Sequence, residues 1–356
     1  MASYEQFLQK QENLSAILTA LRTNGPMTRA LLSERTGLSW GCISELTSEL
    51  IERALITEEK AQDFEGKGRK PQLLDLNRNN LFVGVDINTV GLHVCVCDMT
   101  GAEIAMSRYG LSASDETELI DAVVRAIEAS VFGCNRPILG IGIAMQGIFE
   151  RNLNTWLFPM RARTVRIDIE QAVRARLGIA VIVEHDPNCL LFGYAEANNC
   201  KRWMMVRLDN GVGVSICKNG SFFDGGALEL GYVSVEGEKR LQDYICLRDV
   251  EKMAARQAAG DADAALYMRD IGRHLGTALG NLCNLIHVDE IILCGEMMKY
   301  KACFQAQLLK YYQQTVLPSE EAVIQSVDIT HAAYGAAKLA VERFPYRRES
   351  VVYGSV

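Results

Sequence analysis

The sequence predicts an α/β protein that carries a winged helix-turn-helix at its N-terminal end. Residues 1–79 contain three short amphipathic segments followed by two strand-like segments, whereas the chain from Leu81 onward alternates apolar strands with helical stretches. The length of 356 residues also exceeds one ordinary hydrophobic core, so two or three domains are expected.

The first predicted helix spans residues 13–24. Its apolar residues follow the i, i+3, i+4, i+7 spacing of one helical face: Leu14, Ile17, Leu18 and Leu21. The Gly-Pro pair that comes next ends the helix.

Two further helices are predicted, joined by a glycine turn. Thr28 can cap the first, Gly37 permits the positive φ of a sharp turn, and Ser39 can cap the second. Such a pair forms a helix-turn-helix, whose second helix can enter the major groove of DNA. The residues expected to face base edges are Ser39, Trp40, Gly41, Ser44 and Glu45. Glu45 could accept a hydrogen bond from a cytosine amino group.

A two-stranded wing follows the third helix. Ala54–Thr57 and Pro71–Leu76 are strand-like, and a polar, glycine-containing loop connects them. Residues 1–80 hold ten Lys and Arg against eleven Asp and Glu, so DNA contact would depend on local charge. The cations gathered at the tip of the loop are Lys67, Arg69 and Lys70. We expect double-stranded DNA as the partner; the alternative is a helix-turn-helix used for dimer or protein contacts.

Composition excludes several classes. The chain is 49% hydrophobic and 23% charged, with a net charge of −7, which does not suit a surface coated with nucleic acid as a whole. Its eleven cysteines are scattered without any Cys-x-x-Cys spacing, so we interpret them as reduced, mostly buried residues. No apolar run is long enough to span a membrane and no signal peptide is recognised, so a cytoplasmic protein without membrane insertion is expected.

The order of motifs along the chain resembles the ROK family of repressors and sugar kinases. After the winged helix these motifs are "GVDI", "GIGIAMQG", "VIVEHDPN", "LDNGVGVSI", "ELGY", "IILCGE" and "AAYGAA". The resemblance covers nearly the whole chain and implies an actin-like, ribonuclease H-like sugar kinase fold of two α/β lobes. The implied domains are a DNA-binding head at 1–79, a first lobe at 80–185 plus about 328–346, and a second lobe for sugar binding and dimerisation at 186–327.

The first phosphate loop of the family's kinases is altered here. Where those kinases have Gly-Gly-Thr, this chain has Asn88, Thr89 and Val90. Backbone N–H groups approach phosphate oxygens most closely where no Cβ intrudes. Val90 is β-branched, so it resists a positive φ and would fill the space of a phosphate.

The second phosphate loop is altered as well. Asp209 and Asn210 stand where the kinases have the first two residues of Gly-Thr-Gly. A carboxylate about 4 Å from a phosphate charge, at an effective dielectric constant near 20, would repel it by about 4 kcal/mol. We therefore expect no ATP binding, no cofactor and no catalysis.

The resemblance also implies a sugar pocket that is partly retained. Asp186 stands where the kinases place their general base, and Glu229 in "ELGY" matches the family's sugar-binding glutamate. Three neighbours depart from the family pattern, namely His185, Tyr232 and Gln242. The alternative is that Asp186 and Glu229 are ordinary loop carboxylates.

The zinc site of the family has no counterpart in this sequence. Tyr232 replaces its histidine, and no thiol follows until Cys246. One thiol cannot build a tetrahedral zinc site, so we expect no structural metal. Packing around Tyr232, Leu241 and Tyr244 is expected to support the loop instead.

Three functions remain open at this point. The leading hypothesis is a sugar-responsive transcriptional repressor, a homodimer or dimer of dimers with a degenerate kinase fold. The second is an active ATP-dependent sugar kinase with a regulatory head. The third is a scaffold that binds another protein. ATP-dependent turnover would favour the second, and protein binding that ignores DNA would favour the third.

Overall fold

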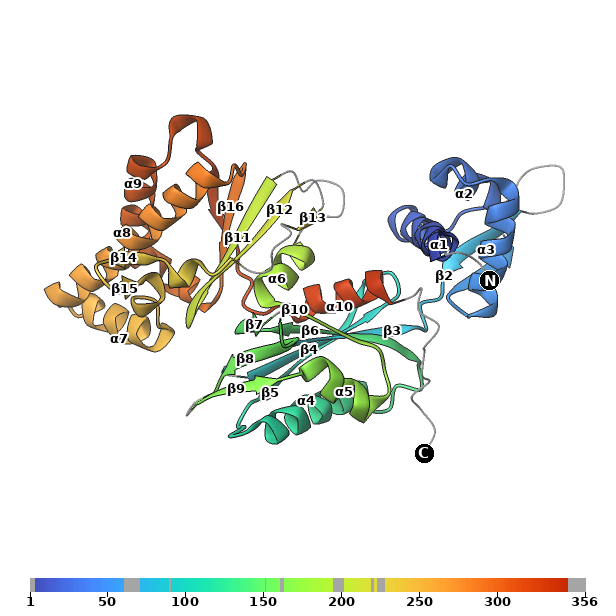
Figure 1. Ribbon diagram of the computed structural model, residues 1–356, viewed down its shortest axis with the longest axis horizontal. Coiled ribbons are helices and arrows are strands. Elements are labelled where there is room, and N and C mark those ends of the chain that lie inside the picture. The colour runs from blue at the N-terminus through green and yellow to red at the C-terminus, as the bar shows by residue number, and fades with distance from the viewer. Residues whose placement is uncertain are drawn as a thin grey trace. The chain divides into compact units, whose positions relative to one another are not determined.

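The computed structural model describes residues 4–60, 71–89, 91–150, 152–160, 163–194, 202–218, 221–222 and 228–344. The chain forms two compact units (Figure 1). The first comprises Met1–Ile143, Ile148–Val183 and Ala336–Val356, and the second comprises Ala144–Gly147 and Glu184–Gly335.

The first unit begins with the winged helix. Its elements are α1 (Tyr4–Asn24), α2 (Arg29–Thr36), α3 (Trp40–Glu52), β1 (Ile56–Lys60) and β2 (Gln72–Leu76), and the two strands pair antiparallel. Helix α1 starts nine residues earlier than the predicted span, and its first turns are largely exposed, with Phe7 55% and Leu8 43% exposed. The residues expected on its inner face are all buried: Leu14, Ile17, Leu18 and Leu21.

Local side-chain chemistry sets the helix ends, as the sequence predicts. The Thr28 hydroxyl accepts from the Leu31 N–H and the Ser39 hydroxyl accepts from the Cys42 N–H, so each satisfies a donor that lacks an intrahelical partner. Gly37 ends α2 with a φ of 72°, the left-handed conformation that glycine adopts without strain. The helix-turn-helix geometry is therefore encoded within a few residues.

An α/β sheet completes the first unit. Its strand order is β10-β6-β3-β4-β5, with β3 Leu81–Asn88, β4 Gly91–Asp98, β5 Glu103–Gly110, β6 Ile138–Met145 and β10 Val181–His185. A smaller sheet contains β7 Ile148–Glu150, β8 Thr155–Pro159 and β9 Thr164–Ile167. Strands β3 and β6 are buried along their whole length. This burial explains their continuous apolar runs.

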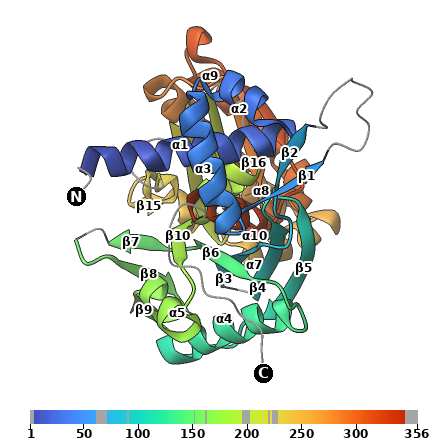
Figure 2. The same ribbon diagram turned by 90° about the vertical axis from the view of Figure 1, so that its right-hand side faces the viewer.

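Helices cover both faces of the larger sheet (Figures 1 and 2). Helices α4 (Glu116–Val131) and α5 (Ile169–Leu177) lie on one face, and α10 (Ala333–Arg343) lies on the other. Gly140 and Gly142 of β6 permit this approach, because a Cβ at either position would collide with Phe344 or with the Ala336 backbone.

The winged helix shares a hydrophobic core with this sheet. Residues of α1, α2 and α3 belong to one buried cluster with Phe82, Met99, Leu139 and Val341. Arg22 of α1 donates to the carbonyl oxygens of Met99 and Val341 at 3.5 and 3.4 Å. The head and the first sheet are therefore packed as one body.

The second unit is built on another five-stranded sheet. Its order is β13-β12-β11-β16-β17, with β11 Arg202–Asp209, β12 Gly211–Lys218, β13 Ser221–Phe222, β16 Glu290–Cys294 and β17 Val323–Ser326. Strands β11 and β12 form a hairpin, whereas β11, β16 and β17 run parallel. Its α-helices are α6 Asp186–Tyr194, α7 Leu247–Ala258, α8 Ala262–Leu285 and α9 Gln305–Thr315.

Helices α8 and α9 pack unusually closely. Gly272, Gly276 and Gly280 recur every four residues on α8, and a Cβ at each would press on the α9 segment. Small residues at this spacing let two helix backbones approach each other. The arrangement fixes α9 against the sheet core.

Candidate functional site

The turn between β3 and β4 is closed by its own side chain. Asn88 is buried, and its Oδ1 accepts a 3.0 Å hydrogen bond from the Gly91 backbone N–H. Its Nδ2 donates to Asp86 Oδ2 at 3.5 Å. The Gly91 backbone N–H is therefore already hydrogen-bonded inside the turn. Thr89 is half-buried beside it, and Val90 lies outside the described residues.

The second altered loop is tied to the elements behind it. Asp209 Oδ1 accepts from the Glu296 backbone N–H at 2.6 Å, where β16 leads into the 3₁₀ helix η3 (Glu296–Cys303). Asn210 Oδ1 accepts from the Leu247 backbone N–H at 3.1 Å, at the first residue of α7. Both side chains thus serve the structure of the loop.

A buried arginine joins the retained base position, Asp186, to Asp209 in the altered phosphate loop. Arg207 of β11 donates from Nη1 to Asp186 Oδ2 at 2.7 Å and from Nε to Asp209 Oδ2 at 2.6 Å. Its Nη2 donates to the Thr330 carbonyl at 3.2 Å. Arg207 is 4% exposed and Asp186 is 8% exposed, so these charge-assisted bonds lie mostly away from water.

This arrangement corrects one expectation. The sequence suggested that the Asp209 charge would repel a triphosphate, but the guanidinium of Arg207, shared with Asp186, pairs with that carboxylate and offsets part of its charge. Electrostatic repulsion is therefore a weaker obstacle than expected. The structural feature that opposes phosphate binding is the turn at Asn88, which a hydrogen bond from Gly91 closes.

The Arg207 interaction was not anticipated from the sequence, although a signal was present. Arg207 interrupts the apolar strand "WMMVRLD", and a charged residue inside a buried strand needs a partner. Its partners Asp186 and Thr330 lie 21 residues before and 123 residues after it in the sequence, so the local sequence pattern could not identify them.

The start of α6 positions His185 and Asp186. Glu184 Oε1 accepts from the His185 backbone N–H at 2.8 Å and from Asn188 Nδ2 at 2.9 Å. His185 and Asp186 are each 8% exposed. The first turn of the helix is therefore a fixed frame for the residue in the base position.

The other three predicted sugar residues belong to a neighbouring segment. Glu229 immediately precedes the 3₁₀ helix η1 (Leu230–Tyr232), and Gln242 lies in η2 (Leu241–Asp243). A Cβ placed on Gly231 would be 3.3 Å from the Gln242 side chain, so η1 and η2 touch. Glu229 keeps an exposed side chain, yet neighbouring groups displace part of its water and raise the pKa of its carboxyl.

The two groups of residues are linked through β12. Arg207 on β11 pairs with Gly213 on β12, and the next residue, Val214, accepts from the Leu228 N–H at 3.2 Å. The segment that carries Glu229 therefore stands one strand away from the Arg207 interaction. All five predicted sugar residues fall in the second unit.

Comparison with known proteins relates this geometry to a family. Residues 82–246 match the model of the ROK family. This part of the chain is therefore similar to the ROK family. It is 23% identical to the DNA-binding transcriptional dual regulator NagC of Escherichia coli K12, over 93% of each chain. It is 22% identical to the xylose repressor of Bacillus subtilis 168, over 83% of this chain and 85% of that protein.

Solved structures agree with the fold. A ROK family transcriptional regulator, described as a homologue of E. coli Mlc, superposes with a TM-score of 0.79 at 18% identity, covering 95% of this chain and 97% of its own. A ROK glucokinase from Streptomyces griseus, solved with glucose and AMPPNP, gives a TM-score of 0.61 at 18% identity and covers 73% of this chain and 99% of its own. The fold is that of the ROK regulators and sugar kinases.

The segment where the resemblance implies a zinc loop contains polar and aromatic contacts. Within the described ranges no group of three or more His, Cys, Asp or Glu side chains could hold a metal. Leu241 is fully buried, and Tyr244 lies 4.3 Å from the His274 ring while its hydroxyl donates to Glu236. Burial, and then the bond to Glu236, raise the pKa of Tyr244 to about 12.

One part of that packing prediction is wrong. Tyr232 is 41% exposed, and the guanidinium of Arg240 lies 5.0 Å from the centre of its ring. Its ring is therefore partly exposed at the surface of the η1 segment and contacts a cation.

The recognition helix exposes the predicted residues. The residues of α3 that face solvent include Ser39, Trp40, Gly41, Ser44 and Glu45, and Trp40 is 58% exposed. The nearby Arg29 is occupied by Glu58 and by the Thr47 hydroxyl. The wing cations Lys67, Arg69 and Lys70 lie outside the described residues.

None of the helices in the described part of the chain has the length and apolarity needed to cross a membrane.

Proposed function

We propose that this protein is a sugar-responsive DNA-binding regulator of the ROK family, acting as a repressor. The observation that carries the proposal is the turn at Asn88, where a buried side chain stands at the first glycine position of the kinase phosphate loop and accepts from the Gly91 backbone N–H. The relatives that match most of the chain are described as regulators and repressors. We infer a protein that binds a sugar without phosphorylating it.

The sugar would contact the second unit. Glu229 can accept hydrogen bonds from two hydroxyl groups, and the exposed ring of Tyr232 can cover an apolar sugar face. Asp186 would hydrogen-bond a further hydroxyl while Arg207 holds its carboxylate in place. His185 and Gln242 would shape the rim of the pocket.

The winged helix would bind an operator as one of a pair. Two heads of a dimer reach one face of DNA when their half-sites lie about 34 Å apart or a multiple of that spacing. Because α1 and the first sheet share a core, movement of that sheet would carry the head with it. A sugar that favours one conformation by about 1 to 3 kcal/mol would change DNA affinity about 5- to 150-fold.

The proposal is tested by a thermal-shift screen over hexoses, N-acetylhexosamines, pentoses and their phosphates. We expect at least one sugar to raise the melting temperature of the wild type, and Glu229→Ala to lose the response. A matched control is Glu238→Ala, since Glu238 is an exposed carboxylate of the same segment. A panel that stabilises neither protein would contradict the proposal.

An active sugar kinase is the second candidate. The observation in its favour is that Asp186, Gly211 and Gly213 are retained and that ROK kinases share the fold. Release of ADP that depends on both the sugar and Asp186 would establish this candidate. We expect no ADP above the background of the Asp186→Asn variant.

A further inference from the structure

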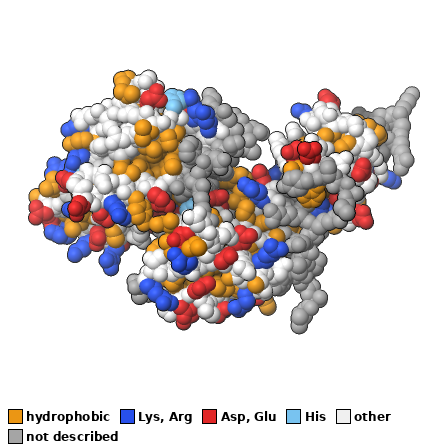
Figure 3. Space-filling view, in the orientation of Figure 1, with side chains coloured by type: hydrophobic (Ala, Val, Ile, Leu, Met, Phe, Trp, Pro, Cys, Tyr) orange, Lys and Arg blue, Asp and Glu red, His pale blue; other side chains and the backbone are white. Residues whose placement is uncertain are grey.

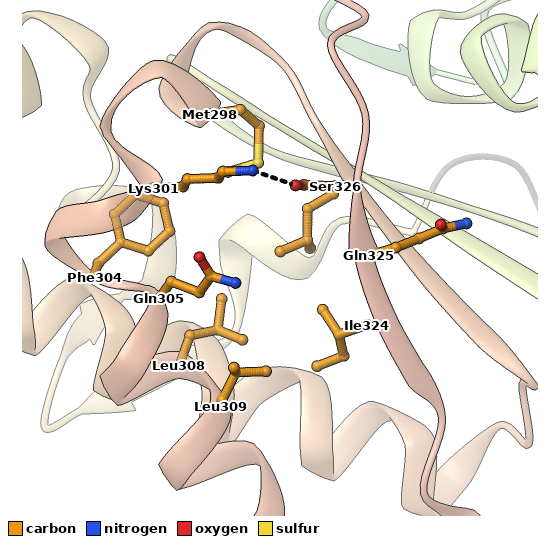
Figure 4. Close-up of a pocket in the computed structure, with 10 residues that line it drawn as sticks. Met298, Lys301, Phe304, Gln305, Leu308, Leu309, Ile324, Gln325 and Ser326 are labelled. Carbon is orange, nitrogen blue, oxygen red and sulfur yellow. Dashed lines mark hydrogen bonds between the residues drawn. The ribbon is translucent and has the colours of Figure 1, made fainter.

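A cavity lies in the second unit, between the edge strand β17 and the start of α9 (Figure 4). Its volume is about 170 Å³. The floor and walls are apolar and come from three elements: Leu293 on β16, Ile324 on β17, and Phe304, Leu308 and Leu309 at α9. Figure 3 shows hydrophobic side chains gathered on this face, in the region of α9 and β16.

The rim of the cavity carries a cation and an amide. Lys301 extends from η3, and its ammonium donates to Ser326 Oγ at 2.9 Å. Gln305 directs its amide into the space between Phe304 and Ile324 (Figure 4). Within the described residues Lys301 forms no ion pair and the Gln305 amide forms no hydrogen bond, and no acidic residue lines the cavity.

Lys301 differs from the nearby Lys299 in its bonding partner. Lys299, two residues earlier, is already paired with Glu296, which raises the pKa of its ammonium. Lys301 has a neutral hydroxyl as its partner and remains exposed at the mouth of the cavity. One positive charge therefore stands over an apolar floor without a carboxylate to balance it.

The floor of the cavity is held in place. Phe304 and Leu308 are 1% exposed, and their backbones pack against Gly272 and Gly276 of α8. This close packing resists movement of α9, so the cavity is formed before any ligand enters. A preformed apolar pocket with a few directed polar groups is the usual form of a small-molecule site.

We propose that this cavity binds a compact organic carboxylate with an apolar body of about one ring. The body would fill the space over Phe304, Leu308 and Ile324, and the carboxylate would accept from Lys301 and from the Gln305 amide. An apolar cavity of about 150 Å³ is known to hold benzene, so the size fits a ring with a small charged group. The inference does not depend on the sugar site.

A single carboxylate suits the rim better than a phosphate group. Phosphate recognition usually gathers several cations or a row of backbone N–H groups, because the group carries more charge. Here one ammonium, one hydroxyl and one amide converge. A neutral molecule of the same shape would contact the apolar floor but would form no ion pair with Lys301.

Isothermal titration with three probes tests the proposal: benzoate, benzyl alcohol and phenyl phosphate. The apolar floor alone should bind benzyl alcohol weakly, and the charge-assisted bonds should make benzoate bind about tenfold more tightly. Lys301→Met should abolish that preference, whereas the matched variant Lys299→Met should retain it. Leu309→Trp should block benzoate by filling the cavity, with circular dichroism confirming its fold.

Several outcomes would overturn the proposal. These are absence of benzoate binding to the wild type at millimolar concentration, equal affinities for benzoate and benzyl alcohol, and unchanged benzoate binding in Lys301→Met. Tighter binding of phenyl phosphate than of benzoate would also overturn it, because the recognised group would then be phosphate.

Discussion

The guanidinium of Arg207 donates from Nη1 to Oδ2 of Asp186 at 2.7 Å, inside the second unit. If the protein were an active sugar kinase, Asp186 would take a proton from the sugar. Here a buried cation holds one oxygen of that carboxylate, and the same cation reaches Asp209 in the altered phosphate loop. The residue in the base position is thereby tied to the framework of the domain.

Replacing Arg207 with methionine should destabilise the second unit strongly. Two mostly buried carboxylates, Asp186 and Asp209, would lose their shared partner, and breaking a buried ion pair from one side costs about 3 to 5 kcal/mol. Urea unfolding followed by Trp203 fluorescence, with Trp40 and Trp156 replaced by phenylalanine, measures this unit. The control is Arg202→Met, whose exposed pair with Asp289 should contribute at most about 1 kcal/mol. Equal effects of the two variants would contradict the role of Arg207.

Sugar affinity should depend on the protonation of Glu229. Partial burial raises the pKa of this carboxyl, so it becomes protonated at a higher pH than an ordinary glutamate. Protonation removes acceptor capacity, and the affinity should fall as the pH drops towards that raised pKa. Stability of the sugar-free protein should change in the opposite sense: it should fall as the pH rises from the ordinary value through the raised one, because the folded state binds the proton more tightly. Titration of wild type and Glu229→Gln at several pH values checks this, since the variant should lose both trends.

Valine at Gly276 should disrupt the contact between α8 and α9. A Cβ there would collide with the Leu308 backbone carbonyl, and neither helix backbone can move without unpacking the core. Overpacking of this kind costs about 1 to 3 kcal/mol, and backbone collisions lie at the upper end. Urea denaturation gives the value. Thr277→Val, one residue further on the same helix and half-buried, should have a much smaller effect.

The recognition helix should read at least one cytosine through Glu45. This carboxylate is exposed on α3 and can accept from a cytosine amino group in the major groove. After selection of a binding site from random DNA, Glu45→Ala should relax the preference at one base pair by about 1 to 3 kcal/mol. The exposed Glu12 on α1 provides the control variant, Glu12→Ala. Selection profiles that are identical for wild type and Glu45→Ala would argue against this contact.

Features of the fold that depend on residues close together in the sequence could be predicted. The caps Thr28 and Ser39, the glycine turn at Gly37 and the continuous apolar strand at Leu81–Asn88 depend on residues a few positions apart. The order of motifs predicted the fold because the motifs are spread over nearly the whole chain, and a ROK regulator structure covers 95% of it. The length of α1 was underestimated because the prediction used only the buried face at Leu14–Leu21, whereas the first turns, with Phe7 and Leu8, are exposed.

The interactions that define the site were harder to predict. The turn at Asn88 was expected to obstruct phosphate by bulk, whereas the structure shows a hydrogen bond from Gly91 that closes it. Arg207 meets Asp186 and Thr330 only after the strands and α6 are assembled. Tyr232 was expected to be packed, but the exposure of a single side chain depends on its tertiary neighbours, in this case Arg240.

The central claim is that a sugar changes DNA binding without being phosphorylated. The most direct measurement is the affinity for a selected operator fragment, determined by fluorescence anisotropy with and without the stabilising sugar, in the absence of ATP and at fixed salt. We expect the sugar to change the operator affinity by at least about fivefold. An operator affinity that ignores the sugar, together with ADP release when ATP is added, would contradict it.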